Sequence, residues 1–294
     1  MDQFEKDTKA LGTALFILMI AGSLLAVFIT VLLLESGYSE GDSAIIANAL
    51  GLVAVETFIL QHYSKKLTYE LPLHMPKATL SIPSYLNYTI AALGVFWGSA
   101  LMINLLSLFV SDYISFSTPD FTPDGSLIGN IFNVGYGILL APIMEELLCR
   151  GLLLGKLKEY GRVFAIVTVS VVFALLHGNL PQAIPAFCLS IVVCCMTLKA
   201  ESILPAISVH MLANLIGYAS MSFSGDLFQL IMNVLNYLVI IAGIILVILY
   251  LRKTPLCRLK DEPHRVMEFF GSWGSMTFLI ISILGMILTF SIQL

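Results

Sequence analysis

The sequence predicts an all-helical, polytopic integral membrane protein, and two features of the 294-residue chain support this prediction. First, 58% of the residues are apolar and only 12% are charged, with a mean hydropathy of +0.93. A soluble domain carries about 25% charged residues. Second, the apolar residues form runs long enough to cross about 30 Å of hydrocarbon, which takes roughly 20 helical residues.

Nine apolar runs are visible, near residues 11–34, 44–62, 86–110, 127–149, 163–177, 183–198, 203–224, 228–250 and 270–292. The fifth and sixth runs are short, so we expect nine transmembrane helices, with eight as the alternative. The first run follows a segment that is not net basic, MDQFEKDTKA, and it is too long for the apolar part of a cleaved signal peptide. We therefore expect it to be retained as a helix.

The 15 Lys and Arg residues of the chain test this count, because cytoplasmic loops are enriched in positive residues. All of them fall at connections that nine spans place on one side: Lys6, Lys9, Lys65, Lys66, Lys77, Arg150, Lys156, Lys158, Arg162, Lys199, Arg252, Lys253, Arg258, Lys260 and Arg265. The opposite connections contain no Lys or Arg, and their acidic residues are Glu35, Glu40, Asp42, Asp112, Asp120, Asp124 and Asp226. The pattern predicts an N-terminus inside and a C-terminus outside.

The cysteines do not indicate a disulfide framework. Four of them, Cys149, Cys188, Cys194 and Cys195, fall within or at the end of apolar runs, and Cys257 lies in an inside loop. Cysteines in such positions usually pack as small apolar side chains.

Three charged residues interrupt the fourth apolar run, which reads LLAPIMEELLCRGLLLG. Each charged side chain at the centre of a membrane costs about 2.5–3.5 kcal/mol, so Glu145, Glu146 and Arg150 must face protein or water. Glu146 and Arg150 are four residues apart with the acid first, which is the favourable order for an ion pair on one helical face. Glu145 points roughly 100° away and needs a different partner.

Polar residues at helical spacing also occur in two later runs. If the chain turns at about Gly161, then Glu145 and His177 are equidistant from the turn and should lie at similar depth. In the seventh run His210 and Asn214 are four residues apart, and the same arithmetic places Glu145 nearest to Asn214. The spacing thus predicts that these side chains share one layer of the membrane.

Each of these residues has a structural interpretation when it is taken alone. A single His or Asn in a transmembrane helix often makes an interhelical hydrogen bond of about 1 kcal/mol. Glu146 and Arg150 can form a purely structural ion pair, and for Phe173, four residues before His177, core packing is the simpler expectation. Glu56, alone in the second run, is expected to be a packing partner. Five ionisable side chains and an Asn in three of nine runs nevertheless indicate a functional site.

The pieces EELLCR, FALLH and HMLAN resemble the EExxxR, FxxxH and HxxxN motifs, in that order, of the CAAX-protease and bacteriocin-processing (CPBP, or Abi) family of intramembrane proteases, which includes the type II CAAX prenyl endopeptidases. The resemblance covers about residues 127–220. It implies a polytopic helical bundle with an intramembrane polar cavity, and proteolysis as the activity. Residues 127–224 would then form the catalytic core, with residues 1–126 and 225–294 as flanking helices.

The resemblance also implies a role for each motif residue in hydrolysis by an activated water. Glu145 would activate the water, assisted by His177, and return the proton to the leaving amine. His210 and Asn214 would donate hydrogen bonds to the oxyanion. Glu146, Arg150 and Phe173 would support the site.

A zinc-dependent version of the same protease is the alternative, with Glu145, His177 and His210 as ligands. We favour the version without a cofactor, because the tight H-E-x-x-H signature is absent and the ligands would have to converge from three helices.

The resemblance therefore implies an endopeptidase acting on membrane-associated or lipidated peptides and proteins. Together with the lack of targeting extensions, it implies a bacterial cytoplasmic membrane. Maturation of a bacteriocin or pheromone peptide, or immunity to one, is the expected role, and the expected partners are the peptide substrate and the lipid bilayer, without nucleic acid. A non-catalytic scaffold or a transporter built on the same fold is the rival interpretation, because intramembrane Glu, Arg and His also line transport paths.

Overall fold

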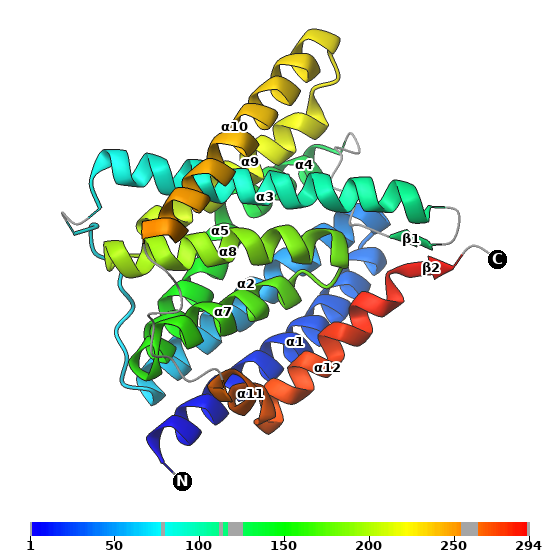
Figure 1. The fold of residues 1–294 in the computed structure, drawn as a ribbon. Coiled ribbons are helices and arrows are strands. Elements are labelled where there is room, and N and C mark those ends of the chain that lie inside the picture. Colours follow the sequence, from blue (N-terminus) through cyan, green and yellow to red (C-terminus); the bar gives the residue numbers. More distant parts are fainter. Residues whose placement is uncertain (1, 78–79, 112–113, 117–125, 254–263, 293–294) are drawn as a thin grey trace.

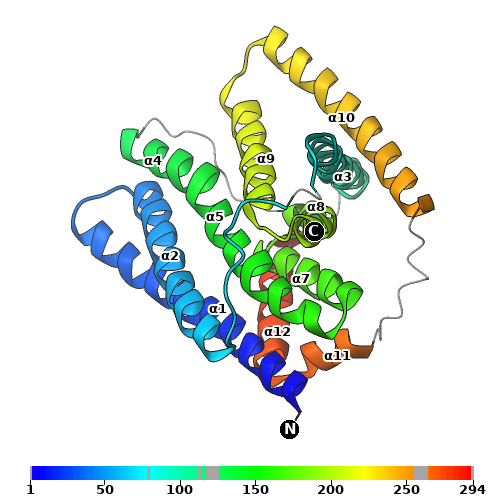
Figure 2. The ribbon, with the colours of Figure 1, turned by 90° about the vertical axis from the view of Figure 1, so that its left-hand side faces the viewer.

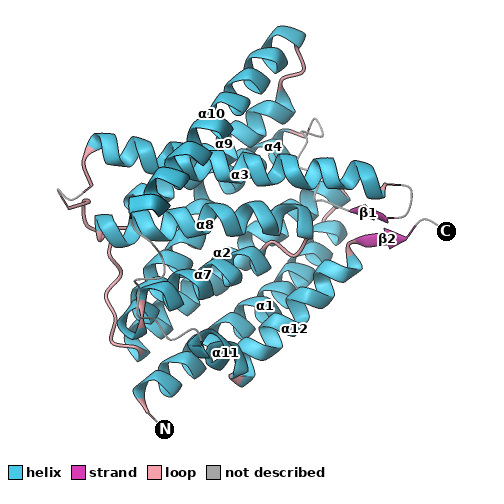
Figure 3. Cartoon of the chain, in the orientation of Figure 1, coloured by secondary structure: helices cyan, strands magenta, loops and turns pink. Residues whose placement is uncertain are grey.

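The computed structural model describes residues 2–77, 80–111, 114–116, 126–253 and 264–292, and these residues are almost entirely helical (Figures 1 and 3). The first half contains α1 (Gln3–Glu35), α2 (Glu40–Lys66), α3 (Ile82–Val110), β1 (Ile114–Phe116), α4 (Leu127–Phe132), η1 (Asn133–Leu140), α5 (Ala141–Glu146), η2 (Leu147–Leu153), α6 (Leu154–Leu157) and η3 (Lys158–Tyr160). The second half contains α7 (Arg162–Leu176), α8 (Leu180–Ala200), α9 (Leu204–Ser222), α10 (Asp226–Lys253), α11 (His264–Gly271), α12 (Trp273–Leu288) and β2 (Phe290–Ile292).

Seven of the described helical segments are long and apolar enough to cross a membrane, or eight if the bent pair α11–α12 is one span. The remaining expected span is the fifth apolar run, which forms α7. This helix has 15 residues, fewer than the roughly 20 that a typical span needs. The predicted count of nine is therefore not confirmed, although every expected apolar run is wholly or mostly helical. Of the residues used for the topology, Asp112, Asp120, Asp124, Arg258 and Lys260 lie outside the described part, as does Cys257.

Two runs differ from the prediction. The fourth run does not end near residue 149, because α4 to η3 form one continuous helical segment from Leu127 to Tyr160, with π-helical turns in η1 and η2. The last run was expected to be one span over residues 270–292. The chain instead bends by 86° between α11 and α12, where Ser272 is extended, and residues 290–292 form a strand antiparallel to β1.

Local sequence explains where several helices begin. Ser39, Ser81, Ser126 and Asn179 each accept a hydrogen bond from a backbone N–H in the first turn of α2, α3, α4 and α8, respectively. The predicted turn at Gly161 is present, and it has a φ of +148° that glycine adopts without strain. The long helical segment and α7 therefore form the hairpin on which the depth argument rests.

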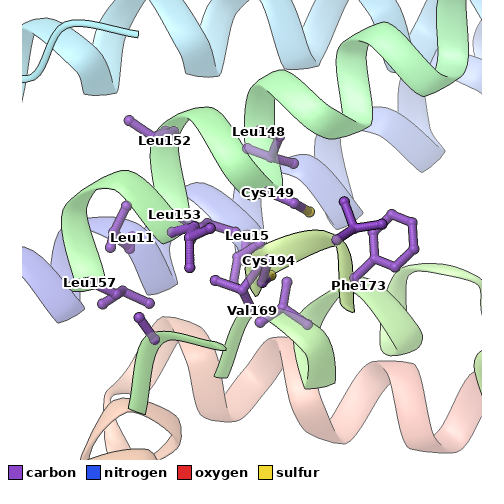
Figure 4. Close-up of a cluster of buried hydrophobic side chains, with 14 of the residues drawn as sticks. Leu11, Leu15, Leu148, Cys149, Leu152, Leu153, Leu157, Val169, Phe173 and Cys194 are labelled. Carbon is purple, nitrogen blue, oxygen red and sulfur yellow. The ribbon is translucent and has the colours of Figure 1, made fainter. Parts of the chain in front are cut away.

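The helices pack as neighbouring layers around this hairpin (Figures 1 and 2). α1 contacts α2 and α12, while α8 contacts α7 and α3, and α3 also contacts α10. Figure 2 shows α9 and α10 diverging from each other, with α3 between them. Buried apolar side chains of η2 and α6 contribute to the core between α1, α7 and α8 (Figure 4); those labelled there are Leu11, Leu15, Leu148, Cys149, Leu152, Leu153, Leu157, Val169, Phe173 and Cys194.

Polar contacts fix the end of the long helical segment. Lys156 Nζ lies 3.2 Å from Asp7 Oδ2, the Tyr160 hydroxyl donates to the same carboxylate, and Arg265 Nη1 donates to the Tyr160 carbonyl at 2.6 Å. These contacts join the starts of α1 and α11 to the turn before α7. Three of the predicted inside groups of positive residues are thereby near one end of the bundle.

A connecting segment, residues 67–77, crosses the same helical segment and is held at its far end. Tyr69 packs directly against Gly155, where a Cβ atom would collide with the phenol ring. Further along, the Ser202 hydroxyl donates to the His74 carbonyl at 2.6 Å, and the Lys77 N–H donates to the Ala200 carbonyl at 3.0 Å. The long helical segment, Leu127 to Tyr160, is thus held by contacts at its end and by the connecting segment that crosses it.

Candidate active site

The predicted ion pair between Glu146 and Arg150 is present and fully buried. Arg150 Nη1 lies 2.8 Å from Glu146 Oε1, and both side chains are 0% exposed. The guanidinium carbon lies 4.4 Å from the centre of the Phe173 ring, so the cation also rests on an aromatic ring. Phe173 therefore packs in the core, as its type suggests, and contacts the motif residues at the same time.

His210 lies between the two adjacent glutamates. Its Nδ1 atom is 3.0 Å from Glu146 Oε1, and its Nε2 atom is 3.8 Å from Glu145 Oε2. Because a carboxylate accepts hydrogen bonds, the contact with Glu146 assigns a proton to Nδ1. The Glu145 side chain is 29% exposed, whereas Glu146 is 0% exposed. Of the two acids, Glu145 is the one that water can reach.

His177 caps the end of α7, with its ring held from one side. Its Nδ1 atom lies 2.8 Å from the Phe173 carbonyl oxygen. That oxygen only accepts hydrogen bonds, so Nδ1 carries a proton and a neutral His177 keeps an acceptor lone pair on Nε2. The Phe173 ring packs edge-on against both imidazoles, with ring centres 5.1 Å from His177 and 5.5 Å from His210.

Asn214 lies one turn from His210 on α9, but its contact differs from the estimate made from helix depth. That estimate placed Glu145 nearest to Asn214, whereas the Glu145 carboxylate contacts His210. Asn214 Nδ2 donates instead to the backbone carbonyl of Gly137 at 2.8 Å. The arithmetic assumed straight α-helices of 1.5 Å rise per residue, whereas η2, which lies between Glu145 and the turn, is π-helical.

Two further residues lie near Glu145. Glu56 of α2 is 6% exposed, and its carboxyl group interacts electrostatically with Glu145. Tyr136 of η1 interacts electrostatically with both acids. A lone acid in an apolar span is the sequence signal for Glu56, although a packing role is the expectation for that residue taken alone. Tyr136 carries no comparable signal in the sequence.

The proposed zinc ligands were also tested against the geometry. Within the described part of the chain, no group of three or more His, Cys, Asp or Glu side chains is arranged to hold a metal ion. His210 Nδ1 is occupied by Glu146, and its Nε2 is 3.8 Å from the nearest oxygen of Glu145. The residues as placed do not fit a zinc ion, and we derive no step through one.

The chain matches a protein-family model over part of its length. Residues 127–216 match a family described as type II CAAX prenyl endopeptidase Rce1-like. The matched segment contains all seven motif residues, from Glu145 to Asn214. No curated protein and no solved structure matches the chain.

Proposed function

We propose that the protein is an intramembrane endopeptidase acting on membrane-associated or lipidated peptides and proteins, because residues 127–216 match the model of the Rce1-like type II CAAX prenyl endopeptidases. One observation supports this proposal most strongly. The three motifs, which lie far apart in the sequence, place His210 between Glu145 and Glu146, with His177 and Arg150 around the same Phe173 ring.

Glu145 is the general base of the proposed reaction. Its partly exposed carboxylate takes a proton from a water molecule as the oxygen of that water attacks the scissile carbonyl carbon. His177 supports this step because its Nε2 lone pair can hold the water. Glu145 then returns the proton to the leaving amine as the C–N bond breaks, so the carboxylate is regenerated.

His210 and Asn214 are the proposed donors to the oxyanion. A donor of this kind typically raises kcat by a factor of about 10²–10³. Because His210 already holds a proton on Nδ1 toward Glu146, it donates from Nε2 only as the imidazolium, and Nε2 lies 3.8 Å from Oε2 of Glu145, the proposed base. Glu146 fixes the ring through Nδ1, and Arg150 compensates the charge of Glu146, so this pair positions a catalytic residue without touching substrate.

The experiment that tests this function compares purified wild-type protein with Glu145→Gln. Both are incubated with membrane-derived and lipidated peptides, and new termini are identified by mass spectrometry. We expect the rate of cleavage to be lower in the variant by a factor of at least about 10³, because the variant lacks the base that takes the proton from water. The proposal fails if a folded variant cleaves as fast as wild type.

Two finer assignments belong to the same proposal. A role in bacteriocin or pheromone peptide maturation, or in immunity, follows from the family resemblance, as does a bacterial cytoplasmic membrane. The inside position of the N-terminus follows from the distribution of Lys and Arg among the connections. In cells, a scaffold should keep its effect when Glu145 is replaced by Gln, whereas a protease should lose it.

A further inference from the structure

The helix immediately before the two glutamates has an interrupted hydrogen-bond ladder. The Ala141 N–H bonds to the carbonyl of Tyr136, five residues back, which is the π-helical pattern. In that pattern the next donor, at position 142, would bond to the carbonyl of Gly137. Position 142 is a buried proline, which has no N–H.

The Gly137 carbonyl therefore lacks both partners that a helix normally provides. In an α-helix its donor would be the N–H of Ala141, but that N–H is directed to Tyr136. In a π-helix its donor would be at residue 142, where Pro142 has none. Gly137 is half-buried in an apolar span, and a carbonyl that lacks a donor where water is scarce costs free energy, so a donor from elsewhere in the protein is favoured at this point.

Asn214 supplies that donor from the facing helix α9, with Nδ2 at 2.8 Å from the Gly137 oxygen. Because the carbonyl can only accept, the contact also fixes which end of the Asn214 amide is the nitrogen. One N–H of the NH₂ group is used in this bond, and the second remains directed by it. The orientation of Asn214 is thus set by a backbone atom five residues before the proline.

We propose that Pro142 is a positioning residue: by withholding an N–H, it reserves the Gly137 carbonyl for Asn214 and so orients the side chain that donates to the oxyanion. The orientation of Asn214 is inferred from the geometry alone, whereas the effect of this orientation on the reaction rests on the proposed protease function. Pro142 itself touches neither substrate nor reacting atoms.

The test is Pro142→Ala, with Pro185→Ala as the matched control, because Pro185 is also buried inside a helix, α8, but lies outside the motifs. In Pro142→Ala the Gly137 carbonyl gains a backbone donor in either register, from residue 142 in a π-helix or from Ala141 in an α-helix. That donor competes with Asn214 for the same oxygen. Both variants should retain or gain thermal stability, since alanine suits a helix interior better than proline.

The first readout is the side-chain amide signal of Asn214 in protein labelled with ¹⁵N-asparagine, assigned by its loss in Asn214→Asp. We expect the Pro142→Ala signal to shift and its protons to exchange faster with solvent, while Pro185→Ala resembles wild type. An unchanged Asn214 signal in Pro142→Ala would overturn the proposal. This readout is independent of activity, so it also decides the matter if the wild-type protein cleaves none of the peptides.

The second readout is kinetic. Misorienting one oxyanion donor should lower kcat about 10- to 100-fold, below the full loss of a donor, with KM nearly unchanged. A variant that is at least as stable as wild type but slower in kcat separates positioning from a structural role. Unchanged kcat in a variant whose Asn214 signal has shifted would refute the link to catalysis.

A second variant covers the case in which Pro142→Ala does not fold. Replacing Ile138 by its α-hydroxy acid converts the Gly137 carbonyl into an ester carbonyl, which is a weaker acceptor. The Asn214 signal should move from its wild-type position, because the amide then donates to a weaker acceptor. An Asn214 signal identical to that of wild type would count against the proposal.

Discussion

Replacing Arg150 by methionine tests whether the buried ion pair holds the site together. Arg150 Nη1 and Glu146 Oε1 are 2.8 Å apart, and both side chains are 0% exposed. Methionine keeps much of the aliphatic volume but leaves the Glu146 carboxylate buried without its cation. Breaking one side of a buried pair costs about 3–5 kcal/mol, so we expect a loss of unfolding free energy of this size.

The double variant Glu146→Gln with Arg150→Met separates the unpaired charge from the loss of packing. Removing both charges leaves no uncompensated ion, and the glutamine carbonyl can still accept the hydrogen bond from His210 Nδ1. We therefore expect the double variant to recover at least about 2 kcal/mol relative to Arg150→Met alone.

Equilibrium unfolding in mixed detergent and SDS micelles, followed by tryptophan fluorescence, provides the measurement. Lys77→Met is the matched control, because the Lys77–Glu201 pair has side chains 55% and 54% exposed and should contribute far less than a buried pair. The reasoning is refuted if Arg150→Met unfolds at the wild-type midpoint, or if the double variant is no more stable than the single one.

Three other predictions follow from the contacts. A methyl group at Gly94 would lie 2.6 Å from the Val239 carbonyl oxygen, so Gly94→Ala should cost about 1–3 kcal/mol of unfolding free energy. Gly98→Ala is the control, since its methyl group would meet its nearest atom at 3.4 Å; equal stability of the two variants would contradict the packing argument. Peptide cleavage should survive a zinc chelator, because no proposed step uses a metal, and a loss that added zinc reverses would support the zinc version instead. Lys77 lowers the pKa of the exposed Glu201 carboxyl, so the pair stabilises the fold above the ordinary pKa of Glu and loses this contribution as the pH falls through the lowered one. The unfolding midpoints of wild type and Glu201→Gln should therefore converge in acid, and a difference that grows at low pH would contradict this sign.

The sequence was sufficient where local rules decide the structure. The spacing of Glu146 and Arg150 predicted their ion pair, because residues four apart share a helical face. Gly161 was identified as the turn of the hairpin, and it adopts the positive φ that glycine permits. Both results depend only on residues close in the chain.

The sequence was insufficient where the helices depart from ideal geometry. The contact of Asn214 with Gly137 depends on a π-helical segment and a proline on another helix, and depth arithmetic contains neither. The bend at Ser272 was missed because the apolar run continues through it. Glu56 is alone in its apolar run, which favours a packing role, and its interaction with Glu145 depends on how α2 packs against the other helices.

The contact between the first and last helices has a consequence for biosynthesis. α1 and α12 run in the same direction side by side (Figure 1), and a Cβ atom at Gly274 would lie 2.5 Å from the backbone of Gly12. Roughly 260 residues separate these glycines, so a ribosome adding about 5–20 residues per second synthesises α12 some 13–52 s after α1. During that interval the α12-facing side of α1 must be covered by lipid or by the insertion machinery. Chains truncated before α12 should therefore be recognised as incomplete by membrane quality-control proteases, even though every motif residue has already been made.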